Sequence, residues 1–423
     1  MTTASEDLTI VDKRLFKAIG LFQILNPTPG ANRCYRIAYM TSMIMSFVVQ
    51  ITQLIGLYFA VNDLQRFAFT TTVISNGFLS LSKGFVLVTN ADRLCAGLEL
   101  ARYEFTSCGS RDQRTARGSR AVLSSILRMF LVLSSVTGFV WALTPLSLMG
   151  DYLPVTNMDG TISRYRVTIY NIWLPIPETV YNAPMVWALI YAVEVVVCFY
   201  NVYSWMLFES YVMTMCFTLN AQFRILSDSF AAIGHRDQSP PPPHATDNHM
   251  IQDHYNNKLH CYNIELINHI QDNQKIIKKY DDFLEVIKPA VLLQIVSGSY
   301  SVITLIFLTS LTYLMGVPII SGPVLKSFFG FLLVTSQLFM YCYVFNHIET
   351  EKSAVNFGLY SSNWTALDLK FKKTLLLAMN MNSAHRRVMK VSPTSIINLE
   401  MFANVMNMSY SIVSVLLNSR TGK

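Results

Sequence analysis

The sequence predicts an all-α integral membrane protein with seven transmembrane helices. Of its 423 residues, 52% are hydrophobic and only 14% are charged, and the mean hydropathy is +0.35. Soluble domains carry roughly 25% charged residues, so this composition excludes an ordinary soluble domain. Crossing a bilayer takes about 20 mostly apolar residues. Seven stretches meet that length: Ile37–Val61, Phe67–Thr89, Ala121–Met149, Ala183–Thr218, Val286–Met315, Val324–His347 and Ser395–Ser419.

The distribution of basic residues predicts the orientation of these helices. Cytoplasmic segments of membrane proteins are enriched in Lys and Arg. Of the 33 Lys and Arg residues, six lie on the side opposite the N-terminus: Arg66, Arg164, Arg166, Lys326, Arg420 and Lys423. Most of the others lie on the N-terminal side, which predicts a cytoplasmic N-terminus and an extracellular C-terminus. The same rule accounts for the net charge of +7, so no nucleic-acid partner is expected.

The spans divide the chain into six regions. They are a cytoplasmic leader (1–36), helices one to four (37–218) with a long outer loop at 150–182, a cytoplasmic loop with anchor helices (219–285), helices five and six (286–347), a further cytoplasmic anchor helix (348–394), and the last span (395–419). The run Pro240–Pro243 cannot be helical, so the segment 234–257, rich in Pro and His, is interpreted as a flexible insertion.

The long outer loop is too aromatic for a disordered linker. It contains Tyr152, Tyr165, Tyr170, Trp173 and Tyr181. We expect it to fold over the outer mouth of the helix bundle as a lid. The alternative is a belt of aromatic side chains at the membrane interface.

Two further segments carry apolar stripes outside the predicted membrane. The stretches Leu259–Lys288 and Trp364–Met381 both repeat apolar residues at helical spacing beside charged ones. Such stripes must be buried against other elements. Together with the end of the fourth span, they predict a compact cytoplasmic helical bundle, which could clamp the subunits of an oligomer.

The last span is long enough to cross a bilayer, yet one of its faces is polar. Its polar residues follow steps of four, three, four, three and four, which places them on one face of a helix: Glu400, Asn404, Asn407, Ser411, Ser414 and Asn418. A polar side chain that faces lipid has no hydrogen-bond partner there. The stripe therefore indicates either hydrogen bonds between helices inside a bundle or a helix that lines a pore.

The chain lacks the motifs of common enzymes. There is no phosphate-binding glycine loop, no dinucleotide fingerprint, no Gly-x-Ser-x-Gly and no His-Glu-x-x-His. Five histidines lie in or near the Pro-rich insertion, and a solvated His-rich loop explains them better than a metal site: His235, His244, His249, His254 and His260. We therefore expect no enzyme activity, no metal and no cofactor.

The end of the chain resembles a known family. The segments that carry the likeness are Glu351–Ser353, Gly358–Trp364, Phe371–Met379 and Leu399–Leu417. They resemble insect odorant receptors, whose final helix typically has the Phe seen at position 402 and a Tyr-Ser pair like Tyr410-Ser411. The endings typical of gustatory relatives and of the odorant co-receptor are absent, so the chain looks like a ligand-specific subunit. The predicted topology and Lys83, late in the second span, agree with the family.

The resemblance implies an odour-gated, nonselective cation channel in the plasma membrane of olfactory sensory neurons. It implies a hetero-tetramer with co-receptor subunits in the membrane lipid, gated by a volatile odorant and permeated by Na⁺, K⁺ and Ca²⁺. The seventh helices would line the pore, with the hydrophobic gate at Val415 and with Asn418 and Ser419 toward the outer mouth.

The resemblance also implies a ligand pocket in the outer half, between spans two, three, four and six. The corresponding residues are Val73, Asn76, Gly77, Ser135, Gly138, Phe139, Trp141, Ala142, Phe199, Tyr200, Tyr203, Phe328, Phe331 and Val334. They would form an apolar cage with few polar groups, suited to a volatile molecule. Asn76, Tyr200 and Tyr203 are candidates to orient its oxygen, as is Ser135.

Two other protein classes predict sequence features that differ from those of this chain. A seven-helix G-protein-coupled receptor is the main alternative, but the predicted topology is inverted, and Asp-Arg-Tyr after span three and Asn-Pro-x-x-Tyr in span seven are absent. A transporter would predict inverted repeats, which the sequence does not show.

Overall fold

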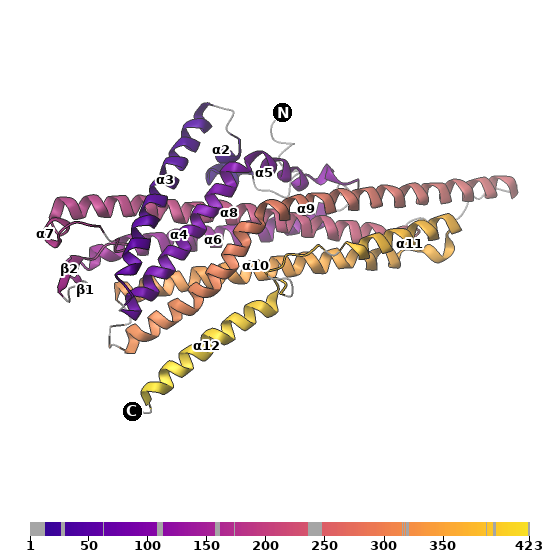
Figure 1. The fold of residues 1–423 in the computed structure, drawn as a ribbon. Coiled ribbons are helices and arrows are strands. Elements are labelled where there is room, and N and C mark those ends of the chain that lie inside the picture. The colour runs from indigo at the N-terminus through magenta and orange to yellow at the C-terminus, as the bar shows by residue number, and fades with distance from the viewer. Residues whose placement is uncertain are drawn as a thin grey trace.

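The computed structural model is an elongated bundle of helices with a small hairpin at one end (Figure 1). It describes residues 13–26, 30–61, 63–107, 113–156, 161–172, 174–235, 248–314, 316, 318, 321–385, 387–391 and 395–421. We call the end that carries the two strands the hairpin end, and the opposite end the long-helix end.

Seven helices correspond to the seven predicted spans. They are α3 (Gly30–Tyr58), α4 (Leu64–Thr89), α6 (Gln113–Ser147), α8 (Pro184–Ala231), α9 (Asn248–Leu314), α10 (Gly322–Ser361) and α12 (Leu399–Thr421). Within the described residues, the first six are long and apolar enough to cross a membrane by length and composition. The helix α12 carries polar residues at intervals along its sequence, beginning with Glu400 in its first turn.

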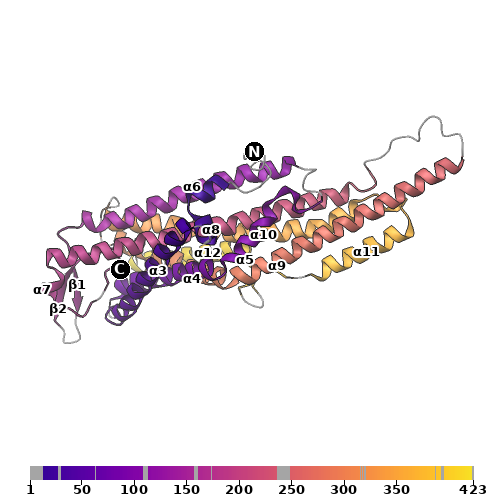
Figure 2. The same cartoon turned by 90° about the horizontal axis from the view of Figure 1, so that it is seen from above.

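Three helices are far longer than a bilayer is thick. Helices α8, α9 and α10 have 48, 67 and 40 residues. At about 1.5 Å per residue they extend roughly 72, 100 and 60 Å, against a hydrocarbon core of about 30 Å. They therefore continue beyond the membrane at the long-helix end, where Figure 2 shows them running past α3 and α4.

The predicted cytoplasmic anchor segment before residue 286 and the fifth predicted span lie on one continuous helix. Helix α9 runs without a break from Asn248 to Leu314 and contains Pro289. Proline removes one backbone hydrogen bond, and neighbouring packing can compensate for that loss inside a bundle. The part of the predicted flexible insertion from Asn248 onward is therefore helical, whereas residues 236–247 lie outside the described residues. Likewise, α10 continues to Ser361, beyond the predicted end of the sixth span.

Short helices pack around the long-helix end and the N-terminal side. They are α1 (Lys13–Ala18), α2 (Leu21–Leu25), α5 (Ala91–Gly97), the 3₁₀ turns η1 (Leu98–Ala101), η2 (Tyr103–Phe105) and η3 (Trp364–Ala366), and α11 (Leu369–Ala384). Asp368 caps α11 by accepting a hydrogen bond from the Phe371 amide at 3.0 Å. Phe371 and Leu375 then face inward and are buried, as their helical spacing predicts.

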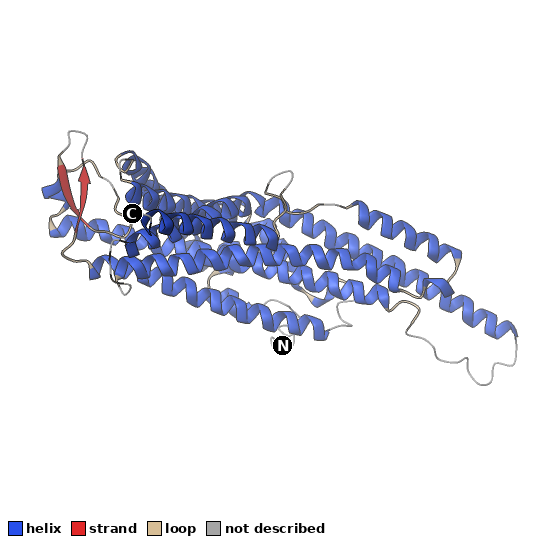
Figure 3. Ribbon diagram, turned by 90° about the horizontal axis from the view of Figure 1, so that it is seen from below, coloured by secondary structure: helices blue, strands red, loops and turns tan. Residues whose placement is uncertain are grey.

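The loop between α6 and α8 contains structure that the sequence analysis did not predict. Strands β1 (Tyr152–Thr156) and β2 (Ile162–Arg166) form an antiparallel hairpin in which Tyr152 pairs with Arg166 and Thr156 with Ile162. Figure 3 shows this hairpin in red at the end of the bundle. The short helix α7 (Glu178–Tyr181) follows and leads into α8. Trp173 lies outside the described residues.

The surroundings of α8 change along its length. In its first half, apolar side chains such as Met185 and Leu189 are exposed, as expected of a helix face that meets lipid. From Ser204 to Phe223 nearly every side chain is buried, including polar Thr214 and Thr218. Helix α8 is thus the central element at the long-helix end, where other helices enclose it.

Candidate functional site

An internal cavity of about 80 Å³ lies between the membrane helices; we call it the inner cavity. Six of the residues expected at the ligand pocket line it: Val73, Asn76, Gly77, Gly138, Trp141 and Val334. Eleven further residues that the sequence analysis did not name complete the lining: Thr72, Ser80, Thr137, Tyr170, Cys198, Asn201, Val202, Trp205, Leu305, Gly330 and Leu333. Helix α9 therefore contributes as well as α4, α6, α8 and α10.

The structure places the other expected pocket residues outside this lining. Phe139, Phe199 and Phe328 point outward and are 55%, 39% and 51% exposed. Phe139 and Phe199 pack edge to face with ring centroids 5.5 Å apart on this outer surface. Each aromatic ring lies on a helix face turned away from the cavity, and only the packing of the helices determines which face that is.

Two expected tyrosines belong to a different cluster. Tyr200 packs against Tyr39 of α3 with ring centroids 5.3 Å apart, and the hydroxyls of Tyr203 and Tyr35 are hydrogen-bonded. Tyr203 also donates to the Ile19 carbonyl at 2.6 Å, which ties α8 to the N-terminal segment. The remaining expected residues lie in the walls beside the cavity without lining it, with Ala142 buried and Ser135 and Phe331 half-buried.

Few polar groups border the inner cavity. The Asn201 amide donates to the Tyr170 hydroxyl at 3.3 Å. The Asn76 amide nitrogen donates to the Thr72 carbonyl at 2.9 Å and to Ser301 Oγ at 3.0 Å. Asn76 Oδ1 and Trp205 Nε1 have no hydrogen-bond partner among the described residues. The cavity wall therefore holds one spare acceptor and one spare donor in an otherwise apolar setting.

A buried carboxylate holds the α6–α8 loop over the cavity. Glu194 of α8 is fully buried and accepts hydrogen bonds from Thr168 Oγ1 at 3.0 Å, the Tyr170 amide at 3.1 Å and the Ile172 amide at 3.3 Å. This places Tyr170 at the cavity. An acid inside an apolar span is a recognisable signal of such a site in the sequence, but Glu194 is not among the predicted residues. Burial raises the pKa of Tyr181 in the same loop, so its hydroxyl remains neutral.

A buried ion pair lies on the long-helix side of the inner cavity. Lys83 Nζ of α4 lies 2.5 Å from Glu209 Oε1 of α8, and both side chains are almost fully buried. The same ammonium donates to Gln294 of α9. The ring of Trp205, which lines the cavity, lies with its centroid 5.2 Å from Lys83 Nζ. Lys83, Glu209 and Gln294 thus form one buried polar cluster just beneath the cavity.

Helix α12 lies at the side of the bundle, where one of its faces packs against α9 and α10 (Figure 1). Phe402 contacts Phe339 of α10 with ring centroids 5.4 Å apart, and Ser409 is buried. The polar stripe points away from this contact, with exposed side chains at Glu400, Asn404, Asn407 and Ser411 and a half-buried one at Ser414. Val415, beside the stripe, is 68% exposed. The side chains of Asn418 and Ser419 lie outside the described residues.

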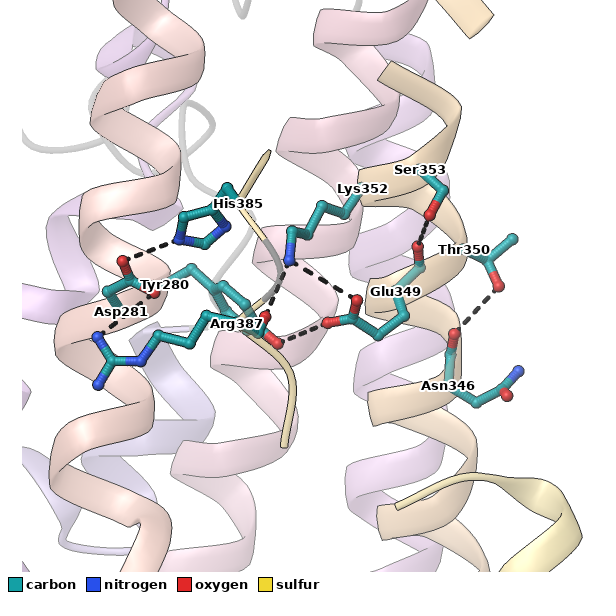
Figure 4. Close-up of polar contacts among 9 residues, drawn as sticks. All are labelled: Tyr280, Asp281, Asn346, Glu349, Thr350, Lys352, Ser353, His385 and Arg387. Carbon is teal, nitrogen blue, oxygen red and sulfur yellow. Dashed lines mark hydrogen bonds and ion pairs between the residues drawn. The ribbon is translucent and has the colours of Figure 1, made fainter. Parts of the chain in front are cut away.

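A polar cluster fixes the segment that leads into α12 (Figure 4). Lys352 of α10 donates to the Arg387 carbonyl at 2.9 Å and lies 3.7 Å from Glu349. Asp281 of α9 pairs with His385 at 3.1 Å and with Arg387 at 3.6 Å. Figure 4 shows that the side chains from α9 and α10 point toward the segment that contains His385 and Arg387. The cluster therefore anchors the segment that leads into α12 to both α9 and α10.

Comparison with known proteins gives one family. A family model described as "7tm Odorant receptor" matches residues 63–410. Odorant receptor 46a, isoform B, of Drosophila melanogaster is 29% identical over 85 residues, which span 20% of this chain and 22% of that receptor's length.

Solved structures give the same fold. The insect olfactory receptor OR5 from Machilis hrabei in complex with eugenol superposes with a TM-score of 0.74 at 13% identity, covering 96% of this chain and 98% of that one. A second structure of OR5 from Machilis hrabei has a TM-score of 0.69 at 14% identity, with the same coverage of both chains. Since the family match covers most of the sequence, this chain is a member of the insect odorant receptor family, a multi-pass membrane receptor with seven transmembrane helices and not an enzyme.

Proposed function

We propose that this receptor is the ligand-specific subunit of an odour-gated, nonselective cation channel that it forms with odorant co-receptor subunits in a hetero-tetramer. A small volatile molecule would bind in the inner cavity, and Na⁺, K⁺ and Ca²⁺ would pass along α12. The observation that carries the proposal is the direction of the polar stripe on that helix.

The polar stripe of α12 faces away from the chain's own helix bundle. Helix α12 packs through Phe402 and Ser409, while Asn404 and Asn407 on the opposite side are exposed. At membrane depth, polar side chains require water or polar partners. This favours the pore interpretation over hydrogen bonding between helices of one chain. Copies of α12 around a common axis would turn their stripes toward a water-filled channel.

The ends of the stripe suit a cation gate. Val415 is exposed beside the stripe, and a ring of such apolar side chains closes a narrow pore by excluding water. In this arrangement Asn418 and Ser419 follow toward the outer mouth. Glu400 at the other end is an exposed carboxylate, which would attract cations and repel anions.

The proposed orientation places the hairpin end outside the cell. The excess of Lys and Arg on the N-terminal side supports it. The helices that continue past the membrane at the long-helix end then form the cytoplasmic anchor, where subunits would meet. The plasma membrane of olfactory sensory neurons is the corresponding location.

The inner cavity suits a small, mostly apolar ligand. An engineered cavity of about 150 Å³ binds benzene, so a cavity of about 80 Å³ would take a smaller molecule, or one the size of benzene after side chains move. Asn76 Oδ1 and Trp205 Nε1 could accept and donate one hydrogen bond each. The related receptor from Machilis hrabei has been solved with eugenol, which supports a volatile ligand for this fold.

The proposal is tested by recording from cells that express this chain with and without co-receptor. A panel of volatiles should evoke cation currents only in the co-expressing cells, and the currents should persist when G-protein signalling is blocked. Loss of every response under that block would favour the coupled-receptor alternative instead.

Cysteine substitution along α12 should separate the two faces of the helix. We expect Ser411→Cys to react with a water-soluble thiol reagent applied outside to open channels and to change the current. Ser409→Cys is the matched control, because Ser409 is 1% exposed and packs against the bundle. Accessibility from outside should decline from Asn418→Cys through Asn404→Cys toward Glu400. Equal reaction at positions 409 and 411 would exclude α12 as the pore-lining helix.

A further inference from the structure

A second hollow lies at the hairpin end, and we call it the outer vestibule. It has a volume of about 300 Å³ against about 80 Å³ for the inner cavity. Residues of four membrane helices line it together with Thr168 and Asn171 of the α6–α8 loop, and Asp63 and Arg66 lie at its rim. The vestibule is therefore the larger and more polar of the two spaces.

The outer vestibule and the inner cavity are stacked one helical turn apart. Each of four helices contributes one residue to the vestibule and another, three positions away, to the cavity. The pairs are Phe69 and Thr72 on α4, Thr144 and Trp141 on α6, Leu308 and Leu305 on α9, and Ser327 and Gly330 on α10. One turn of helix rises about 5.4 Å. A single layer of side chains can therefore separate the two spaces.

That layer consists of Phe69, Lys326 and Trp141. The Lys326 ammonium lies 4.7 Å from the ring centroid of Phe69 and 4.5 Å from that of Trp141. The two rings are nearly parallel, with centroids 6.3 Å apart. Lys326 is buried, at 7% exposed, with its ammonium close to both rings. Phe69 and Lys326 belong to the vestibule lining, and Trp141 to the cavity lining.

Among the described residues, the hydrogen-bond acceptor that the Lys326 ammonium reaches is a neutral group. Its Nζ donates to the Ile169 carbonyl at 2.6 Å. The carboxylate of Glu194, the nearby acid, already accepts from Thr168, Tyr170 and Ile172. Replacing the ammonium with an apolar group therefore leaves the three hydrogen bonds to Glu194 in place.

We propose that ligands enter the inner cavity from the outer vestibule through this layer, and that Lys326 sets the rate of their passage. The molecules that pass are neutral and mostly apolar, because a cation would meet the buried ammonium. This proposal rests on the proposed function, in which the inner cavity binds the ligand. Lys326 is a positioning group on the path and not a contact of the bound ligand.

The first test compares rates with apparent affinity for Lys326→Met. An ammonium held over aromatic rings is a barrier that both entry and exit must disturb. Removing it should raise the rates of response onset and of washout by equal factors, about tenfold each, and leave the half-maximal concentration nearly unchanged. The Lys326→Arg variant should keep the slow onset and washout of the wild type. Phe328→Leu, two positions along on the lipid-facing side, should match the wild type.

The second test blocks the vestibule from outside. Ser327→Cys places a thiol in the vestibule lining, and a membrane-impermeant reagent should then slow the onset of the response. Ile162→Cys on the exposed hairpin is the control, and its modification should change nothing. Unchanged onset after modification at 327, or a shifted half-maximal concentration with unchanged rates in Lys326→Met, would overturn the proposal. A wild-type receptor with no volatile response would instead refute the proposed function.

Discussion

Replacing Lys83 with Met should sharply reduce the amount of folded receptor at the cell surface. The ammonium and Glu209 are both almost fully buried, so the substitution leaves an unpaired carboxylate inside the bundle. Breaking such a pair typically costs about 3–5 kcal/mol. Surface biotinylation and thermal unfolding of the purified receptor would measure the loss. We expect a large fall in both.

The double variant Lys83→Met with Glu209→Gln should recover much of that loss, because neither charge is then left alone. Arg93→Gln is the control, because it removes a salt bridge that contributes little to stability. Arg93 pairs with Glu285 at 3.5 Å, but both side chains are more than half exposed, and such pairs contribute about 0–1 kcal/mol. If the thermal unfolding of Lys83→Met matched that of Arg93→Gln, the Lys83–Glu209 pair would not stabilise the bundle.

Trp141→Ala should shift the response to the receptor's volatile ligand strongly to higher concentrations. Trp141 lines the inner cavity, stacks on Phe69 and donates from its indole to the Lys326 carbonyl at 3.1 Å. Truncating a large aromatic residue in a packed site costs about 3–5 kcal/mol, which corresponds to on the order of 100-fold or more in apparent affinity. Dose–response curves recorded at matched surface expression would measure this shift in the half-maximal concentration.

Phe139→Ala is the informative control for this prediction. The family resemblance implies that Phe139 belongs to the same pocket, whereas the structure exposes it on the outer surface beside Phe199. We expect its dose–response curve to remain close to the wild type. Similar shifts for Phe139→Ala and Trp141→Ala would mean that the ligand binds elsewhere in the bundle.

The positions of the membrane helices could be predicted from the sequence because the bilayer imposes a length and a composition on each span. All seven predicted spans fall on helices of the structure. The stripe of α12 was also visible, since helical spacing alone places Glu400, Asn404, Asn407 and Ser411 on one face. Where the helices end outside the membrane could not be predicted. The continuous α9 through Pro289 shows that packing at the long-helix end overrides a local breaker.

For the candidate site, the sequence identified the helices but only part of the lining. Val73, Asn76 and Trp141 reach the inner cavity, but Phe199 and Phe328 do not. Apolar spans carry no periodic signal that separates a face toward a ligand from a face toward lipid, because both environments select the same side chains. Lys326 and Glu194 are the exceptions, because a charge inside a span must find a partner, although the sequence does not name that partner.

The sequence by itself determined that this chain crosses a membrane seven times and that its last helix is polar on one side. Both follow from chemistry that each residue carries individually: hydropathy, charge and helical spacing. Only the tertiary structure decided which face of each helix borders the inner cavity, that Tyr170 of a distant loop completes it, and that the Lys326 ammonium lies near the rings of Phe69 and Trp141. These features depend on the rotation and crossing of five helices, which arise from packing across residues far apart in the chain.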